Sequence, residues 1–300
     1  MSANLQSGQP VPHEGYISVQ KAELYYREIG QGRCIFILHG GPDFDHNYLL
    51  PDMDRLSGDF RLIYYDQRGR GKSAGNVQPQ DVTMQSEIED LEALRRYFQL
   101  ESVGVLGHSW GGVLAMEYAI RHPDRVSHLI LMNTAPASHN DYALFRQEFL
   151  KRLGDNAEKR QALASSVEYA EGDPDTVAAY YRIQYGATVR RLDDLDKVIA
   201  SLRSSFTKES ILKSWAIEDR LVDETWGLSE YDLLPALTRL SIPTLVIHGD
   251  YDFVPVECSV HIAQAIPGAR LVVLEDTGHF SYLESPNAVR EAIVDFFHSN

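Results

Sequence analysis

The stretch VGVLGHSWGG, from Val103 to Gly112, decides the fold of this chain. Its apolar first part, Val103 to Leu106, is typical of a buried strand, and apolar residues recur at helical spacing from Val113 to Ile120. Residues 107–111 between them read GHSWG, a G-x-S-x-G motif. A strand, a sharp turn and a helix in this order predict a nucleophile elbow that pushes the Ser109 hydroxyl out beyond the sheet edge.

Further strands and helices alternate along the chain on both sides of this stretch. Apolar runs predict strands at Cys34–Leu38, Leu62–Tyr65, Leu129–Met132, Thr244–Ile247 and Leu271–Leu274, and helical spacing predicts helices at 83–100 and 287–297. Gly15–Val19 and Leu24–Glu28 are expected to form an antiparallel pair at a sheet edge. The alternation predicts an α/β fold with a mostly parallel central sheet and helices on both of its faces.

The pattern changes between the runs Leu129–Met132 and Thr244–Ile247. Strand-like runs vanish over residues 135–236, and charged helical segments replace them at 141–153, 175–185 and 192–206. We interpret 135–236 as a helical cap inserted into one core domain formed by 1–134 and 237–300. A separate domain of unrelated function is the alternative, but the sheet strands resume after the insertion.

Composition excludes several classes of protein. The chain has 300 residues and a formal net charge of −15, which argues against nucleic acid or an anionic membrane surface as a partner. Its two cysteines, Cys34 and Cys258, are too few for a disulfide framework, and Cys34 is expected to be a buried free thiol. Residues 1–12 read as a loose polar tail without a signal peptide, and no apolar stretch is long enough to span a membrane. We therefore expect a cytoplasmic protein.

A nucleophilic serine needs a base and an acid that orients it, and in folds with this elbow the acid and then the histidine follow the serine along the chain. The strand ending at Ile247 leads into a loop with two carboxylates, Asp250 and Asp252. We favour Asp252, because Asp250 lies closer to the turn and is suited to bracing it. The loop after the last strand contains one histidine, His279, which we predict to be the base.

An acyl-transfer site also needs hydrogen-bond donors for the developing oxyanion. One predicted donor is the backbone N–H of Trp110, the residue after the candidate nucleophile. The other is expected in the loop His39-Gly40-Gly41-Pro42 after an early strand, where we choose Gly41 over its neighbour Gly40.

Two other polar stretches are assigned structural roles. Residues 66–73, DQRGRGKS, lack the spacing of a phosphate-binding loop, so we expect a turn held by Asp66 and Arg68 behind the oxyanion loop. Residues 43–46, DFDH, offer too few ligands for a metal site, and we expect a solvated helix start there. No metal or organic cofactor is expected.

Taken together, these motifs resemble the α/β-hydrolase superfamily and, within it, the proline iminopeptidase family. The matching pieces are HGGP at 39–42, DQRG at 66–69, GHSWGG at 107–112, the acid loop at 249–252 and Gly278-His279. The resemblance implies a serine peptidase that removes N-terminal proline or other residues, with the helical insertion as a lid and with Gly41 and Trp110 as oxyanion donors. Its substrate would be a small molecule or short peptide, cleaved through an acyl-enzyme.

The chain departs from that family at three points. Asp43 stands where the family usually has glycine after HGGP, Phe253 follows the predicted acid, and the usual lid segment rich in tryptophan and glutamate is not recognisable. Cap acids are candidates for binding a substrate amine by charge alone, although a solvated helix face is the simpler expectation for each: Glu218, Asp219, Asp223, Glu224 and Glu230. The alternatives are a carboxylesterase or lactonase for neutral acyl groups, and a non-catalytic binding protein.

Overall fold

The computed structural model describes residues 11–300, so most of the tail predicted at 1–12 lies outside the described residues. Within them lies one sheet of eight strands in the order β1-β2-β4-β3-β5-β6-β7-β8. The first two pairs, β1–β2 and β2–β4, are antiparallel, and all later neighbours are parallel. The strands are β1 (His13–Val19), β2 (Ala22–Ile29), β3 (Cys34–Leu38), β4 (Arg61–Tyr65), β5 (Val103–His108), β6 (Val126–Met132), β7 (Thr244–Gly249) and β8 (Arg270–Leu274). The predicted fold class is confirmed.

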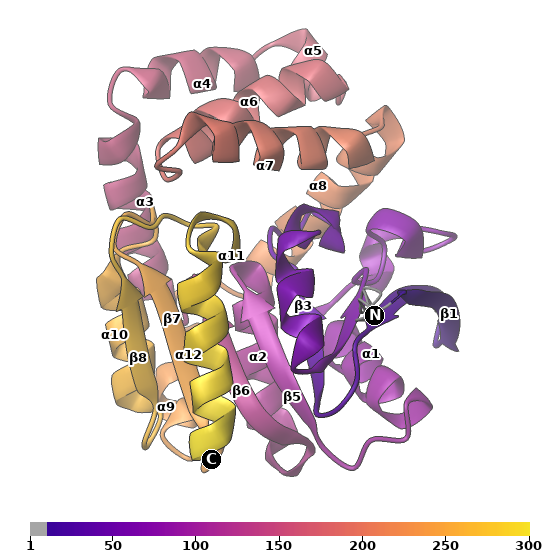
Figure 1. The fold of residues 1–300 in the computed structure, drawn as a ribbon. Coiled ribbons are helices and arrows are strands. Elements are labelled where there is room, and N and C mark those ends of the chain that lie inside the picture. Colours follow the sequence, from indigo (N-terminus) through magenta and orange to yellow (C-terminus); the bar gives the residue numbers. More distant parts are fainter. Residues whose placement is uncertain (1–10) are drawn as a thin grey trace, which may run out of the picture.

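Helices cover both faces of the sheet (Figure 1). Alternate strand side chains point to opposite faces, and they build two apolar clusters. One cluster joins the sheet to α1 (Met84–Tyr97), α2 (Trp110–Arg121) and α10 (Val256–Ala265). The other joins it to α12 (Pro286–Ser299). The shorter elements are α9 (Leu234–Leu237), α11 (Ser281–Glu284) and the 3₁₀ helices η1 (His46–Leu49), η2 (Asp52–Gly58), η3 (Gly71–Ser73), η4 (Pro79–Asp81) and η5 (Pro123–Arg125).

Six helices between β6 and β7 lie above the sheet at the upper end of Figure 1, and we call them the cap. They are α3 (His139–Leu153), α4 (Asn156–Ala164), α5 (Val167–Ala170), α6 (Pro174–Gly186), α7 (Leu192–Ser205) and α8 (Lys208–Asp223). Side-chain caps start several of them; for example, the Thr207 hydroxyl accepts the Ser210 N–H at the start of α8. The three predicted cap segments correspond to α3, α6 and α7, while the boundary at 135–236 stays a prediction.

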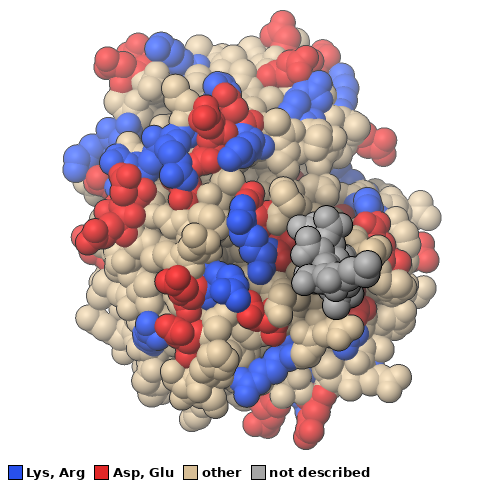
Figure 2. Space-filling model, viewed as in Figure 1, with Lys and Arg blue, Asp and Glu red and all other residues tan. Residues whose placement is uncertain are grey.

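Charged side chains of both signs are interspersed over the face shown in Figure 2. The acidic excess therefore does not form a single-sign field on this face. Among residues 11–300, every helix is too short or too polar to cross a membrane. Both cysteines are free thiols, and Cys34, the first residue of β3, is only partly buried rather than fully buried as expected.

Candidate active site

The turn between β5 and α2 has the geometry of an elbow. Ser109 adopts φ 55° and ψ −121°, a backbone conformation that costs a non-glycine residue energy and that clusters at functional sites. The Ser109 N–H donates to the Met132 carbonyl at 3.2 Å, which ties the turn to β6. A Cβ on Gly107 would lie 2.2 Å from the Gly111 oxygen, so only glycine lets the strand and helix approach this closely.

The predicted histidine and acid lie in hydrogen-bond contact. The His279 Nδ1 atom is 2.9 and 3.0 Å from the two carboxylate oxygens of Asp252, and both side chains are buried. Asp252 also accepts the Val254 N–H at 3.0 Å and the Asn133 side-chain amide at 2.8 Å. Burial alone would raise the pKa of Asp252, but the charge of His279 and the hydrogen bonds with His279 and the Val254 N–H outweigh it and lower the pKa to about 2. Asp252 is therefore an ionised partner for the imidazole.

The second carboxylate of the acid loop has a different partner. Asp250 accepts the Thr277 N–H at 3.1 Å and so braces the loop that leads to His279. This is the bracing contact that the sequence suggested for Asp250, and it leaves Asp252 as the one facing His279.

A buried histidine next to Ser109 connects the loop of residues 39–42 to the His279 loop. The Gly40 N–H donates to the Tyr48 hydroxyl at 2.6 Å, and that hydroxyl lies 2.7 Å from His108 Nδ1. His108 Nε2 lies 2.9 Å from the His279 carbonyl, so the neutral tautomer with its proton on Nε2 satisfies every partner. Burial, aided by the charge of His279, lowers the pKa of His108 to about 3, which keeps the ring neutral.

The DQRG stretch contacts the loop of residues 39–42. The Gln67 N–H donates to His39 Nε2 at 3.0 Å, and the Gln67 side-chain amide donates to the His39 carbonyl at 2.8 Å. Buried ion pairs then hold this turn to α1: Arg68 contacts Asp90 at 2.6 Å, and Arg70 contacts Glu87 at 2.7 Å. The arginines of this stretch are thus occupied by carboxylates, and the Asp66 carboxylate accepts from His46 at 2.6 Å.

Ser109 faces a cavity of about 640 Å³ between the cap and the core. Gly41 and Trp110, the predicted oxyanion donors, line the same cavity. One wall is aromatic: Phe253 from the acid loop packs against Phe145 and Phe149 of α3 at ring distances of 5.3 and 5.5 Å. The volume and the mixture of aromatic and polar walls suit a small-molecule ligand.

Three carboxylates of the described residues line this cavity, and two of them, Asp43 and Glu218, come from distant parts of the chain; the third, Asp219, neighbours Glu218. Asp43 follows the oxyanion loop and accepts the Tyr181 hydroxyl, and Glu218 comes from α8 of the cap. Within residues 11–300, neither forms an ion pair with a lysine, arginine or histidine. Burial raises the pKa of Asp43 to about 6, and burial together with the charge of Asp43 raises that of Glu218 well above its usual range.

These positions correct two expectations from the sequence. Asp43 and its neighbours start a helix, since Asp45 caps η1, but the segment is largely buried under α6 rather than solvated. Glu218 and Asp219 line the cavity and do not lie on a purely solvated face. By contrast, Glu224 accepts the Met84 N–H at 2.8 Å, a structural contact outside the cavity. Asp43 and Glu218 are buried by segments that lie far away in the chain, so the sequence around each of them carries no sign of that burial.

Two residues that support the site were not identified from the sequence. Asn133 directly follows β6; its amide donates to Asp252 and to the Gly278 carbonyl at 3.0 Å. Thr188, in the turn between α6 and α7, accepts the Phe253 N–H on its hydroxyl at 2.9 Å and the His279 N–H on its carbonyl at 3.3 Å. The position of Asn133 at the carboxyl end of a central parallel strand was a usable signal; Thr188 had none.

With this geometry in place, comparison with known proteins identifies the family. The family model for the alpha/beta hydrolase fold matches residues 34–286, which is well over half of the chain. The chain belongs to the α/β-hydrolase family. Among curated relatives of this hydrolase, the proline iminopeptidase of Saccharolobus solfataricus is 28% identical, with 94% of this chain and 91% of the relative covered. The proline iminopeptidase of Heyndrickxia coagulans is 27% identical over 95% of this chain and 99% of the relative.

Solved structures with the same fold include enzymes with different substrates. The proline iminopeptidase of Mycobacterium smegmatis superposes on this hydrolase with a TM-score of 0.71 at 23% identity, covering 96% of this chain and 98% of the other. The enol-lactonase of Burkholderia xenovorans superposes with a TM-score of 0.65 at 26% identity, covering 95% of this chain and 100% of the other. The fold is therefore shared by peptidases and lactonases, and the substrate has to be inferred from the cavity.

Proposed function

We propose that this hydrolase is a serine aminopeptidase of the proline iminopeptidase type. In this proposal Ser109 attacks the acyl carbon, His279 takes its proton and passes it to the leaving amine, and Asp252 orients the imidazole. The backbone N–H groups of Gly41 and Trp110 stabilise the oxyanion, and water then releases the acyl-enzyme. Gly41 is preferred over Gly40 because the Gly40 N–H is already bound by Tyr48.

The pair of cavity carboxylates carries the choice of substrate. Asp43 and Glu218 are desolvated acids in the cavity of Ser109. Arg160 lines the same cavity and its charge acts on Glu218, but no cation of residues 11–300 forms an ion pair with either acid. Burying a carboxylate without a cation is costly, and a bound ammonium group would supply that cation. A substrate with a free N-terminal amine places such a group near its scissile bond. The aromatic wall of Phe145, Phe149 and Phe253 then offers an apolar surface for a pyrrolidine ring.

A carboxylesterase or lactonase is the second candidate, and the same aromatic wall is what favours it. A neutral acyl group would use the phenylalanine side chains without needing Asp43 or Glu218. The two candidates therefore differ in a single property, the dependence of turnover on a free amine.

A matched pair of substrates tests this dependence. Prolyl-p-nitroanilide and N-acetyl-prolyl-p-nitroanilide differ only by the charge on the amine, and p-nitrophenyl esters and small lactones report the alternative. We expect cleavage of the free amine and little of the acetylated compound. Ser109→Ala is expected to lower turnover by on the order of 10⁴ to 10⁶. Equal cleavage of both anilides, or faster cleavage of lactones than of prolyl-p-nitroanilide, would reject the aminopeptidase.

A variant of the cap separates amine recognition from the chemistry. Glu218→Gln keeps the size of the side chain and removes its charge. A hydrogen bond to a charged group contributes about 1.5–3 kcal/mol, so kcat/KM for prolyl-p-nitroanilide is expected to fall roughly 10- to 100-fold relative to that for a p-nitrophenyl ester. Glu158→Gln, the same change at an exposed residue of cap helix α4 that lines neither cavity, is the control. The cytoplasmic location inferred from the sequence stays a prediction.

A further inference from the structure

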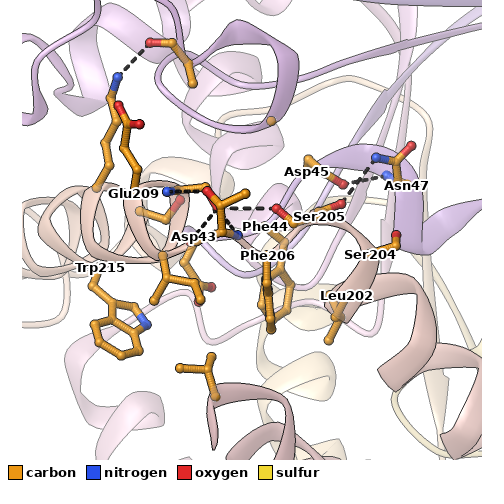
Figure 3. Close-up of a pocket in the computed structure, with 18 of the residues that line it drawn as sticks. Asp43, Phe44, Asp45, Asn47, Leu202, Ser204, Ser205, Phe206, Glu209 and Trp215 are labelled. Carbon is orange, nitrogen blue, oxygen red and sulfur yellow. Dashed lines mark hydrogen bonds between the residues drawn. The ribbon is translucent and has the colours of Figure 1, made fainter. Parts of the chain in front are cut away.

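A second cavity of about 500 Å³ lies between the cap and the core, next to the cavity of Ser109. Three side chains line both cavities and so form the partition between them: Asp43, Tyr181 and Trp215. Figure 3 shows the core loop with Asp43 and Asp45 and the cap side chains Phe206 and Trp215 gathered around this second space. A hydrogen bond from Tyr181 to Asp43 crosses the partition and links the cap to the core there.

The partition lies close to the oxyanion loop. Asp43 is two residues after Gly41, so their Cα atoms are at most about 7.6 Å apart. An extended peptide advances about 3.3–3.6 Å per residue. A peptide bound with its scissile carbonyl at Gly41 therefore reaches the partition with the first or second residue of its leaving group, and the residues after that enter the second cavity.

The lining of the second cavity suits a peptide chain. Each peptide unit brings a donor and an acceptor that need partners once they are buried. The cavity offers hydroxyl and amide groups from both sides of the cleft: Asn47, Ser204, Ser205 and Ser214. Aromatic rings of Phe44, Phe206 and Trp215 supply apolar contact area beside them for side chains.

We propose that this second cavity is a binding subsite for the leaving peptide, and that it takes the second and third residues after the scissile bond. The inference rests on the proposed aminopeptidase function and adds a preference for leaving groups of two or more residues. Acyl recognition stays in the first cavity, at the aromatic wall and the carboxylates. The leaving chain passes from one cavity to the other beside Tyr181 and Trp215, while Asp43 stays with the amine of the residue before the scissile bond.

A dependence on peptide length needs no variant to be observed. For proline followed by one, two, three and four alanines, with amidated ends, kcat/KM is expected to rise by about tenfold or more up to a leaving group of three residues and then to level off. A flat series from one residue onward overturns the inference. If the enzyme cleaves prolyl-p-nitroanilide but shows the flat series, only the subsite fails; if it cleaves neither anilide nor peptides, the aminopeptidase itself fails.

A cavity-filling variant locates the effect. Ser205→Trp places a large ring in the second cavity from the end of α7, and Ala200→Trp adds the same ring at an exposed position of that helix outside the cavity. We expect Ser205→Trp to lower kcat/KM for the three-alanine peptide by about tenfold or more relative to prolyl-p-nitroanilide, and Ala200→Trp to leave that ratio unchanged. If this ratio of the two kcat/KM values is the same in both variants and in the parent, the inference is overturned. If Ser205→Trp does not fold, the series of peptide lengths is the test.

Discussion

Thr188→Val is the substitution that most sharply tests how the cap supports the site. Thr188 is fully buried between the cap and two core loops. Its hydroxyl accepts the N–H of Phe253, the residue after Asp252, and its carbonyl accepts the N–H of His279. A Cβ on Gly278 would lie 1.6 Å from that carbonyl oxygen, so the turn and the His279 loop are in direct contact. One cap residue thus holds the loops of both the acid and the histidine.

The expected cost follows from these contacts. Valine preserves the shape of the side chain but leaves the buried Phe253 N–H without an acceptor, which costs about 1–3 kcal/mol. The unfolding temperature is then expected to fall by roughly 2–10 °C. Because Asp252 and His279 both depend on this anchor, we expect kcat to fall about tenfold, while KM changes less than about twofold.

The assay is kcat and KM on one chromogenic substrate, together with thermal unfolding. Thr188→Ser is the matched control, because it keeps the hydroxyl and loses only a methyl group, at about 1 kcal/mol. It is expected to retain most of kcat. The reasoning is refuted if the valine variant has the kcat of the parent, or if the serine and valine variants lose the same fraction of kcat.

Three other perturbations have expected outcomes. Asn133→Ala removes the donor to Asp252 and to the Gly278 carbonyl. We expect kcat to fall by about 10- to 100-fold in kinetic assays, and the free energy of unfolding in urea to fall by about 1–3 kcal/mol. An unchanged kcat would count against a positioning role for Asn133. Asp43 has a pKa raised to about 6 by burial, above its ordinary 3.8, so its contribution to stability is present below about pH 4 and is lost as the pH rises through 6. Asp43→Asn should therefore raise the free energy of unfolding by on the order of 1–3 kcal/mol more at pH 7.5 than at pH 4, and an equal change at both would contradict this. Arg70→Ala leaves the buried Glu87 carboxylate without its cation, so the free energy of unfolding in urea is expected to fall by roughly 3–5 kcal/mol. A fall of less than about 1 kcal/mol would show that the two side chains do not form a buried ion pair.

The sequence predicted those features that depend on local patterns. Strands such as Cys34–Leu38 match their predicted bounds because an apolar run of five residues between polar segments is a short-range signal. The choice of Asp252 over Asp250 also rested on local turn geometry, and the structure gives Asp250 the bracing contact expected of it. The elbow at Ser109 follows from the glycines beside it.

Features that depend on contacts between distant segments were not predicted. Thr188 lies 65 residues before Phe253 in the chain, and its position in a turn of the cap gives no sign of that contact. Glu218 has the sequence pattern of a surface residue on an amphipathic helix, and only the packing of α8 over the core brings it into the cavity with Asp43. Spacing along one element predicts which face is buried, whereas it does not say what the buried face meets.

Covalent labelling tests the central assignment most directly. A fluorophosphonate reacts with an activated serine, and the mass of the intact protein followed by peptide mapping reports how many residues react and which ones. We predict one adduct per chain, on Ser109, and none in Ser109→Ala. An unlabelled parent protein, or an adduct on a residue other than Ser109, would contradict the assignment of Ser109 as the nucleophile.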